Sequence, residues 1–200
     1  MKKLSFYLVA AGFALNFMSC GSSDTTTQTQ DSTQIQTQTP QVQTTTFTSQ
    51  EIGWTVEVPG DWISEDVAKM NASVDPNGPQ ILLQLHKASN NVMLATGKNI
   101  GPDAIDEWER SLAKNLESHW EGLKKKGLTF EVKNSEASID HYDFRVYESE
   151  MKNSEGKTVM YESIYASYIN GYDFMVILIY NNDQDAAALL KMMEGSTFQK

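Results

Sequence analysis

Apolar residues in the middle of the chain recur at every third or fourth position, the spacing that places them on one side of a helix. The stripe consists of Ile105, Trp108, Leu112, Leu116, Trp120 and Leu123. Acidic residues crowd its start, Lys124, Lys125 and Lys126 stand at its end, and Gly127 follows. This order of charge complements the helix dipole and explains the lysine triplet without a ligand. The pattern predicts an amphipathic helix over about 103–126.

Alternating or continuous apolar runs elsewhere predict β-strands. They lie at 47–59, 81–85, 92–95, 128–132, 144–151, 158–169 and 172–180. Asn170-Gly171 is a strong hairpin signal, and the run after it is apolar at both parities, which is typical of a central strand covered on both faces. A second helix is expected over about 185–194, capped by Asp183. We therefore predict an α+β fold, an α-β-α sandwich with a mostly antiparallel sheet.

The start of the chain has the pattern of a secretory signal peptide. Lys2-Lys3 precede an apolar run over 4–15, which is shorter than the ~20 residues that a membrane-spanning helix needs. The stretch Phe17-Met18-Ser19-Cys20 then resembles a bacterial lipoprotein lipobox, although Phe17 stands where Leu is usual. Cys20 is the single cysteine of the chain. The resemblance implies a signal peptide over 1–19 and lipid attachment at Cys20; an ordinary signal peptide with an incidental cysteine is the alternative.

Lipid at this position would anchor the protein in the cell envelope through burial of its acyl chains. Gly21 follows the cysteine, in place of the Asp that retains some lipoproteins at the inner membrane. We therefore expect an outer-membrane anchor. Both the periplasmic and the surface-exposed side remain open.

A polar stretch after the cysteine predicts a disordered tether over 20–46. Ten of residues 21–46 are Thr and seven are Gln, and few apolar side chains are present to offset the cost of ordering the backbone. The triplets that contain Thr25 and Ser32 resemble the Asp-Ser/Thr-X acceptor of a bacterial O-glycosylation pathway. They are candidate glycosylation sites, and a bare spacer is the alternative.

Composition limits the classes of partner. The chain has 16 basic and 26 acidic residues, for a net charge of −10, which disfavours nucleic acid and favours a basic partner. The segment 47–200 is long enough to fold around its own core.

Several motifs within 47–200 resemble those of PsbP/Mog1-like domains, a family that includes DcrB-type envelope lipoproteins. The stretch GWTVEVPGDW at 53–62 is similar to the aromatic-x-φ-x-φ-Pro-x-x-Trp signature near the start of these domains. IDHYDF at 139–144, NGYDF at 170–174 and GSTF at 195–198 fit later parts of the family pattern. The resemblance implies an α-β-α sandwich, and it carries over no catalytic residue.

Candidate chemistry is sparse in the sequence. His86, His119 and His141 lack metal-ligand spacing, and no Gly-x-Ser-x-Gly elbow is present. A calcium-loop-like run at 181–185 lacks the Gly and Glu that such a loop requires. We expect no cofactor, no metal and no enzymatic activity.

Aromatic residues offer one candidate binding surface. All seven tyrosines after the signal peptide fall in 142–180, and Tyr161 and Tyr165 share one face of a predicted strand. With Trp62 they form a candidate recognition face for a protein or a glycan, since aromatic residues are enriched in binding hot spots. Packing in the core or at its rim is the alternative for these residues.

These observations favour a non-enzymatic, lipid-anchored envelope domain that binds a protein or an envelope component. The alternative is a small-ligand carrier or weak hydrolase with a pocket between sheet and helix, around Trp54, Trp62 and Trp108. Large aromatics of this kind are more often core residues.

Overall fold

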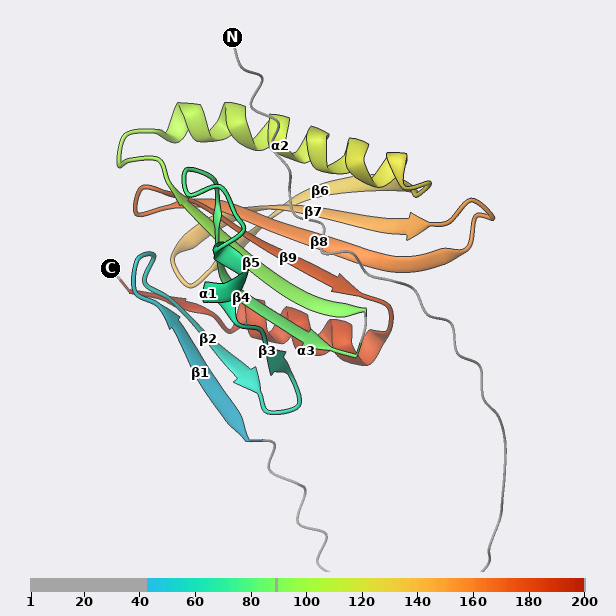
Figure 1. The fold of residues 1–200 in the computed structure, drawn as a ribbon, viewed down its shortest axis with the longest axis horizontal. Helices are drawn as coiled ribbons and strands as arrows, with labels where there is room; N and C mark the ends of the chain where they lie inside the picture. The colour runs from blue at the N-terminus through green and yellow to red at the C-terminus, as the bar shows by residue number, and fades with distance from the viewer. Residues whose placement is uncertain (1–42, 89, 200) are drawn as a thin grey trace, which may run out of the picture.

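A seven-stranded antiparallel sheet forms the centre of the protein (Figure 1). The computed structural model describes residues 43–88 and 90–199. In sheet order the strands are β3 (Ile63–Ser64), β4 (Gln80–Lys87), β5 (Asn91–Asn99), β9 (Tyr172–Tyr180), β8 (Thr158–Ile169), β7 (Tyr142–Lys152) and β6 (Thr129–Ile139). The predicted sites at Cys20, Thr25 and Ser32 lie outside the described residues.

The two faces of this sheet are covered by different layers (Figure 1). Helix α2 (Ile105–Lys125) lies over one face. Helix α3 (Asp183–Glu194) and a small sheet cover the other, where α1 (Val67–Asn71) packs beside β4. The small sheet has the order β1 (Thr44–Ser49), β2 (Trp54–Pro59), β10 (Thr197–Phe198). The predicted α+β fold with a mostly antiparallel sheet is confirmed.

Helix α2 forms where the apolar stripe predicts it. Trp108, Leu112 and Leu116 are buried against the sheet, and acidic residues fill the first turn and lysines the last. The helix begins at Ile105, and Ala104 precedes it without a side-chain cap. It ends before Gly127, whose φ of 82° continues the chain in the left-handed region that favours glycine.

Strand β9 is central, as its apolar run at both parities predicts. Two clusters of buried apolar residues flank the sheet. The α3-side cluster includes Trp54, Phe144 and Phe198, and Phe174, Val176 and Leu178 of β9 pack in it. The α2-side cluster consists of Trp108, Leu112, Leu116, Ile164 and Ala166 together with Ile177 of β9. The preceding hairpin turns at Asn170 and Gly171, which both have positive φ, the conformation of a type I′ turn. A Cβ at Gly171 would also lie 3.1 Å from the carbonyl carbon of Gly101, so this turn packs closely against the start of the α2 segment.

The small sheet departs from the prediction in its extent. Strand β1 begins at Thr44, three residues before the predicted domain start, because its polar threonines pair with β2 through backbone hydrogen bonds. Strand β10 adds to the other edge of β2, with Thr197 opposite Thr55. Helix α3 begins two residues early, and Asn182 caps it in place of Asp183 by accepting the N–H of Asp185.

Candidate functional site

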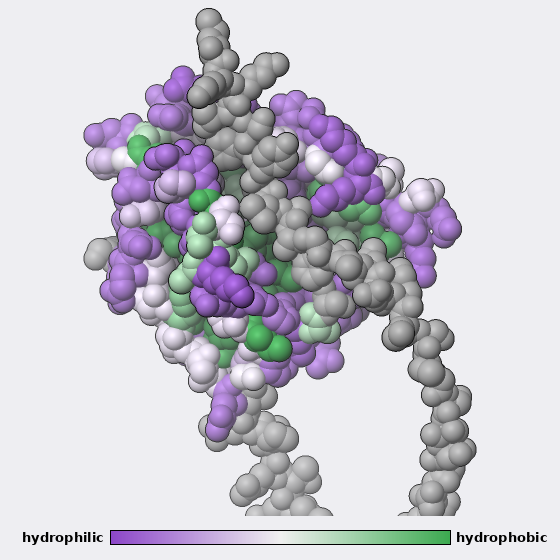
Figure 2. All heavy atoms as spheres, in the orientation of Figure 1, coloured by the Kyte–Doolittle hydropathy of each residue, from purple (hydrophilic) through white to green (hydrophobic). Residues whose placement is uncertain are grey.

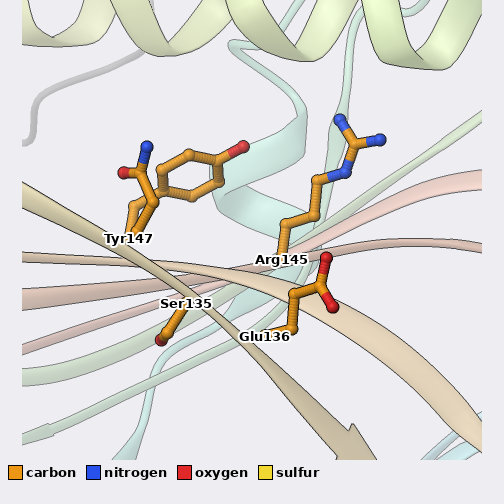
Figure 3. Close-up of a pocket in the computed structure, with 5 residues that line it drawn as sticks. Ser135, Glu136, Arg145 and Tyr147 are labelled. Carbon is orange, nitrogen blue, oxygen red and sulfur yellow. The ribbon is translucent and has the colours of Figure 1, made fainter.

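Strands β6 and β7 line a hollow of about 230 Å³, and α2 runs over the same side of the sheet (Figure 3). We refer to it as the α2 groove, and its lining residues are Asn134, Ser135, Glu136, Arg145 and Tyr147. The strand register places Asn134 opposite Tyr147 and Glu136 opposite Arg145. In Figure 3 Arg145 extends toward the helix, while Ser135 points the opposite way. Four polar side chains are thus grouped on one side of two neighbouring strands.

Arg145 is held in place by α2. Its guanidinium donates a hydrogen bond to the carboxylate of Glu109 and lies over the ring of Trp108, 5.1 Å from the ring centroid. A guanidinium stacked on an aromatic ring and bound to a carboxylate has few positions open to it. The groove therefore presents a preformed cation at one end.

The start of α2 is fixed by hydrogen bonds to the sheet. Trp108 donates its indole N–H to Asp173 Oδ1 at 3.0 Å. Burial raises the pKa of Asp173, and the bond from Trp108 opposes that effect. Tyr168 donates its hydroxyl to the Gly101 carbonyl and accepts the N–H of Ala104 at 3.2 Å. These bonds tie the start of α2, beside Arg145, to strands β8 and β9.

The second half of α2 covers a buried polar pair. His119 Nε2 lies 2.9 Å from Glu162 Oε2, and Glu162 is 2% exposed. Glu162 Oε1 has no hydrogen-bond partner among the described residues, and neither has the buried hydroxyl of Ser149, which stands opposite Glu162 in the register. Ser149 makes no hydrogen bond to His119, so the three residues lack the nucleophile–base contact of a hydrolase.

The predicted recognition face of Tyr161, Tyr165 and Trp62 is not assembled. Tyr161 is 40% exposed and stacks on Tyr180 with ring centroids 5.7 Å apart. Tyr165 and Trp62 are each 6% exposed, and burial raises the pKa of Tyr165 to about 12. Both lie in the α3-side core, so they cannot form a solvent-facing surface. The alternation of the strand predicts that Tyr161 and Tyr165 share one face, but it does not predict which layer covers that face.

The three tryptophans of the alternative hypothesis do not line one pocket. Trp54 and Trp62 belong to the α3-side cluster, and Trp108 lies on the opposite face of the sheet. Histidines are also dispersed: His86 contacts Glu65 at 3.0 Å and His141 contacts Asp140 at 3.1 Å. Within residues 43–88 and 90–199, no group of three or more His, Cys, Asp or Glu side chains is placed to hold a metal ion.

The α2 groove was not predicted from the sequence. Arg145 and Glu109 are 36 residues apart, and the two strands that supply the other residues show only ordinary alternation. The available signal was that Arg145 is one of only two arginines in the chain.

Comparison with known proteins supports the fold. The solution structure of cyanobacterial PsbP (CyanoP) from Synechocystis sp. PCC 6803 superposes with a TM-score of 0.54 at 13% sequence identity. The match covers 78% of this chain and 92% of CyanoP. The chain therefore has a PsbP-like fold. No family model matches the sequence, and no curated protein matches it either.

Hydropathy adds one further observation. Figure 2 shows hydrophilic residues around much of the outline of the molecule and apolar ones nearer the middle of this face. None of the helices in the described part of the chain combines the length and apolar character needed to cross a membrane.

Proposed function

We propose that this protein is a non-catalytic binding domain, held at the cell envelope by lipid on Cys20, and that the α2 groove contacts a protein or glycan partner. The observation that carries the proposal is the fixed position of Arg145 between Glu109 and Trp108. A side chain already held in one geometry loses little entropy when a ligand binds. The groove is thus built before its ligand arrives.

The chemistry of the α2 groove favours a polar ligand. Glu136 offers an acceptor, Arg145 offers donors, and Asn134 and Tyr147 offer both. Trp120 packs edge-on against Tyr147 with centroids 6.0 Å apart, which adds an aromatic wall. Such a mixture suits a peptide segment or a sugar. The net charge of −10 would steer a basic partner toward the domain.

Binding through the groove can be tested with the full lipidated chain as bait in its own envelope. Replacing Asn134 and Glu136 together by Ala removes two polar contacts of about 1 kcal/mol each, so the affinity for the partner should fall roughly thirtyfold and its recovery should fall accordingly. Glu57→Ala, on the exposed side of β2, is the matched control and should leave recovery unchanged. Equal recovery by a folded double variant would show that the partner does not use the groove.

The anchor is a separate part of the proposal and has its own test. The lipobox-like stretch and the resemblance to DcrB-type lipoproteins support lipidation at Cys20, followed by placement in the outer membrane. Cys20→Ser should abolish acyl labelling and release the protein from the membrane fraction. Continued labelling of this variant would rule out Cys20 as the lipid site. Mass spectrometry of the mature protein tests sugar at Thr25 and Ser32, which would add hexose mass.

A second candidate function is a small-ligand carrier or weak hydrolase. The α2 groove favours it to the extent that it is a hollow on the side of the sheet that α2 covers. A small molecule that co-purifies with the native protein, and is lost from the Asn134→Ala, Glu136→Ala variant, would favour this function over partner binding.

A further inference from the structure

Strand β6 is a long, regular edge of the seven-stranded sheet (Figure 1). It has eleven residues, contains neither Pro nor Gly, and pairs with β7 without a register shift. Its outer edge pairs with no strand of the described part of the chain. Strand β3, at the opposite edge, has two residues. A long, regular edge is a template for a further strand, and charged side chains on it restrict which strand can pair there.

The charges on β6 are unbalanced within one copy of the chain. Ser135 stands opposite Val146, which packs in the α3-side cluster, so the odd-numbered residues of β6 share that face. On it the exposed Glu131 stands opposite Glu150. Like charges directly opposite each other are unfavourable in a sheet. Exposed Lys133, two positions along, stands opposite Glu148.

We propose that two copies of this chain pair through their β6 strands, antiparallel and centred on Val132. Each Glu131 then faces Lys133 of the partner subunit, and each Lys133 lies between its own Glu148 and the partner's Glu131. Val132 stands directly opposite Val132 of the partner subunit, and both of these side chains lie on the opposite face of the sheet from Glu131 and Lys133. Within one copy Lys152 Nζ already lies 3.7 Å from Glu150 Oε2. The pairing adds a counter-charge at Glu131 itself, and by symmetry it does so twice.

The same charges select the register. A two-fold axis perpendicular to the sheet keeps each side chain on its own face, so the pairing centres on a residue and joins residues of equal parity. Centring on Asn134 would pair the whole strand, but it sets Lys133 against Ser135 and Glu131 against Ala137. Only the register centred on Val132 places Glu131 of one copy opposite Lys133 of the other. Residues 129–135 pair in this arrangement.

The surroundings of β6 leave space for the second copy. The backbone of helix α2 lies nearest β8, two strands inward from β6. Its last turn reaches β6 through Lys124, whose Nζ lies over the Phe130 ring, 5.8 Å from the ring centroid, and this contact leaves the outer edge of β6 open. Most residues of β6 are exposed on both faces. Residues 129–135 are far fewer than the roughly 20–30 residues that each side of a standard interface contributes, so we expect a weak dimer that is best detected by covalent trapping.

The test uses the full chain with Cys20→Ser, which removes its one thiol and makes the result independent of anchoring. Val132→Cys in this background places two cysteines directly opposite, about 4.5–5.5 Å apart at Cα, within reach of a disulfide. Asn134→Cys is the matched control. In this register the cysteines at position 134 of the two copies are displaced along the strands by four residues, or about 13 Å, which is too far for a disulfide. A disulfide dimer is expected under mild oxidation with Val132→Cys alone. No dimer of folded Val132→Cys, or equal trapping with Asn134→Cys, would overturn the proposal.

A charge exchange tests the basis of the pairing. Lys133→Glu turns two attractive pairs into two repulsive ones and should slow trapping through Val132→Cys roughly tenfold. Adding Glu131→Lys restores opposite charges in the reversed sense and should recover most of the trapping. Trapping that is indifferent to both changes would show that the charges do not join the copies. Circular dichroism of each variant confirms that the fold is retained.

Discussion

The two faces of the seven-stranded sheet are packed with different kinds of side chain. On the α3 side, aromatic rings touch in a continuous group, with Trp54 and Phe174 at 5.2 Å and Phe144 and Phe198 at 5.9 Å between centroids. On the α2 side, a smaller apolar cluster is interrupted by buried Asp173 and by other polar residues. The α3 side holds the larger buried cluster, and we expect it to supply more of the stability. The other can carry binding groups.

The largest effect is expected on the aromatic face. Phe174 is fully buried and contacts three other rings, so Phe174→Ala should lower the free energy of unfolding by about 3–5 kcal/mol. Urea denaturation measures the loss. Leu116→Ala, on the α2 face, should cost less, about 2–3 kcal/mol, because the helix can settle toward the sheet. An equal or larger cost at Leu116 would contradict the proposed division between the faces.

The next largest effect is expected at the buried pair under α2. His119→Leu leaves the Glu162 carboxylate without its hydrogen-bond partner, which should cost about 2–4 kcal/mol. Adding Glu162→Leu removes the unpaired charge, and the double variant should regain most of the loss. Thermal unfolding of both variants completes the comparison. If Glu162→Leu instead lowers the stability further, the two side chains do not act as a pair.

A smaller effect is expected at the rim of the α3 side, where charges are fully paired. Asp185 binds Lys87 Nζ at 2.9 Å and Asn91 at 2.8 Å, and the bonds from Asn182 and Lys87 lower its pKa below 3.8. Its contribution is therefore present above pH 3.8 and is lost as pH falls through the lowered pKa. Asp185→Asn should cost about 1–2 kcal/mol at neutral pH and flatten the acid limb of the stability curve. An unchanged acid limb would contradict this assignment.

The smallest effect is expected at Asp173, with the opposite dependence on pH. Burial raises its pKa above 3.8, so the folded state takes up a proton before the unfolded state does as pH falls. Its contribution to stability therefore rises on acidification and declines as pH increases through the raised pKa. Asp173→Asn keeps an oxygen for Trp108 and removes the charge, and it should gain less than about 1 kcal/mol at neutral pH. A clear loss would mean that the charge itself is needed.

Local patterns predicted the elements whose environment repeats along the chain. The stripe of α2 and the doubly apolar β9 specify burial directly, and Asn170-Gly171 specifies the turn between two strands. Pairings between segments that are far apart along the chain have no local sequence pattern from which they could be predicted. Strand β10 joins β2 across more than a hundred residues, and Tyr165 is buried by layers that its own strand does not encode.

The candidate site was beyond local pattern for the same reason. Arg145 looks like any outward-facing residue of an alternating strand until α2 places Glu109 and Trp108 beside it. The charges of β6 were visible in the sequence, but their imbalance depends on the register with β7.

The seam between β2 and β10 has a consequence for biosynthesis. Gln199 donates its backbone N–H to the Gly53 carbonyl, and a Cβ at Gly53 would lie 2.8 Å from the Gln199 carbonyl oxygen. Strand β10 follows every other described element along the chain, so β2 stays incomplete on this side until the final strand has been synthesised. During translation the nascent chain would expose one edge of β2 until β10 emerges and pairs with it.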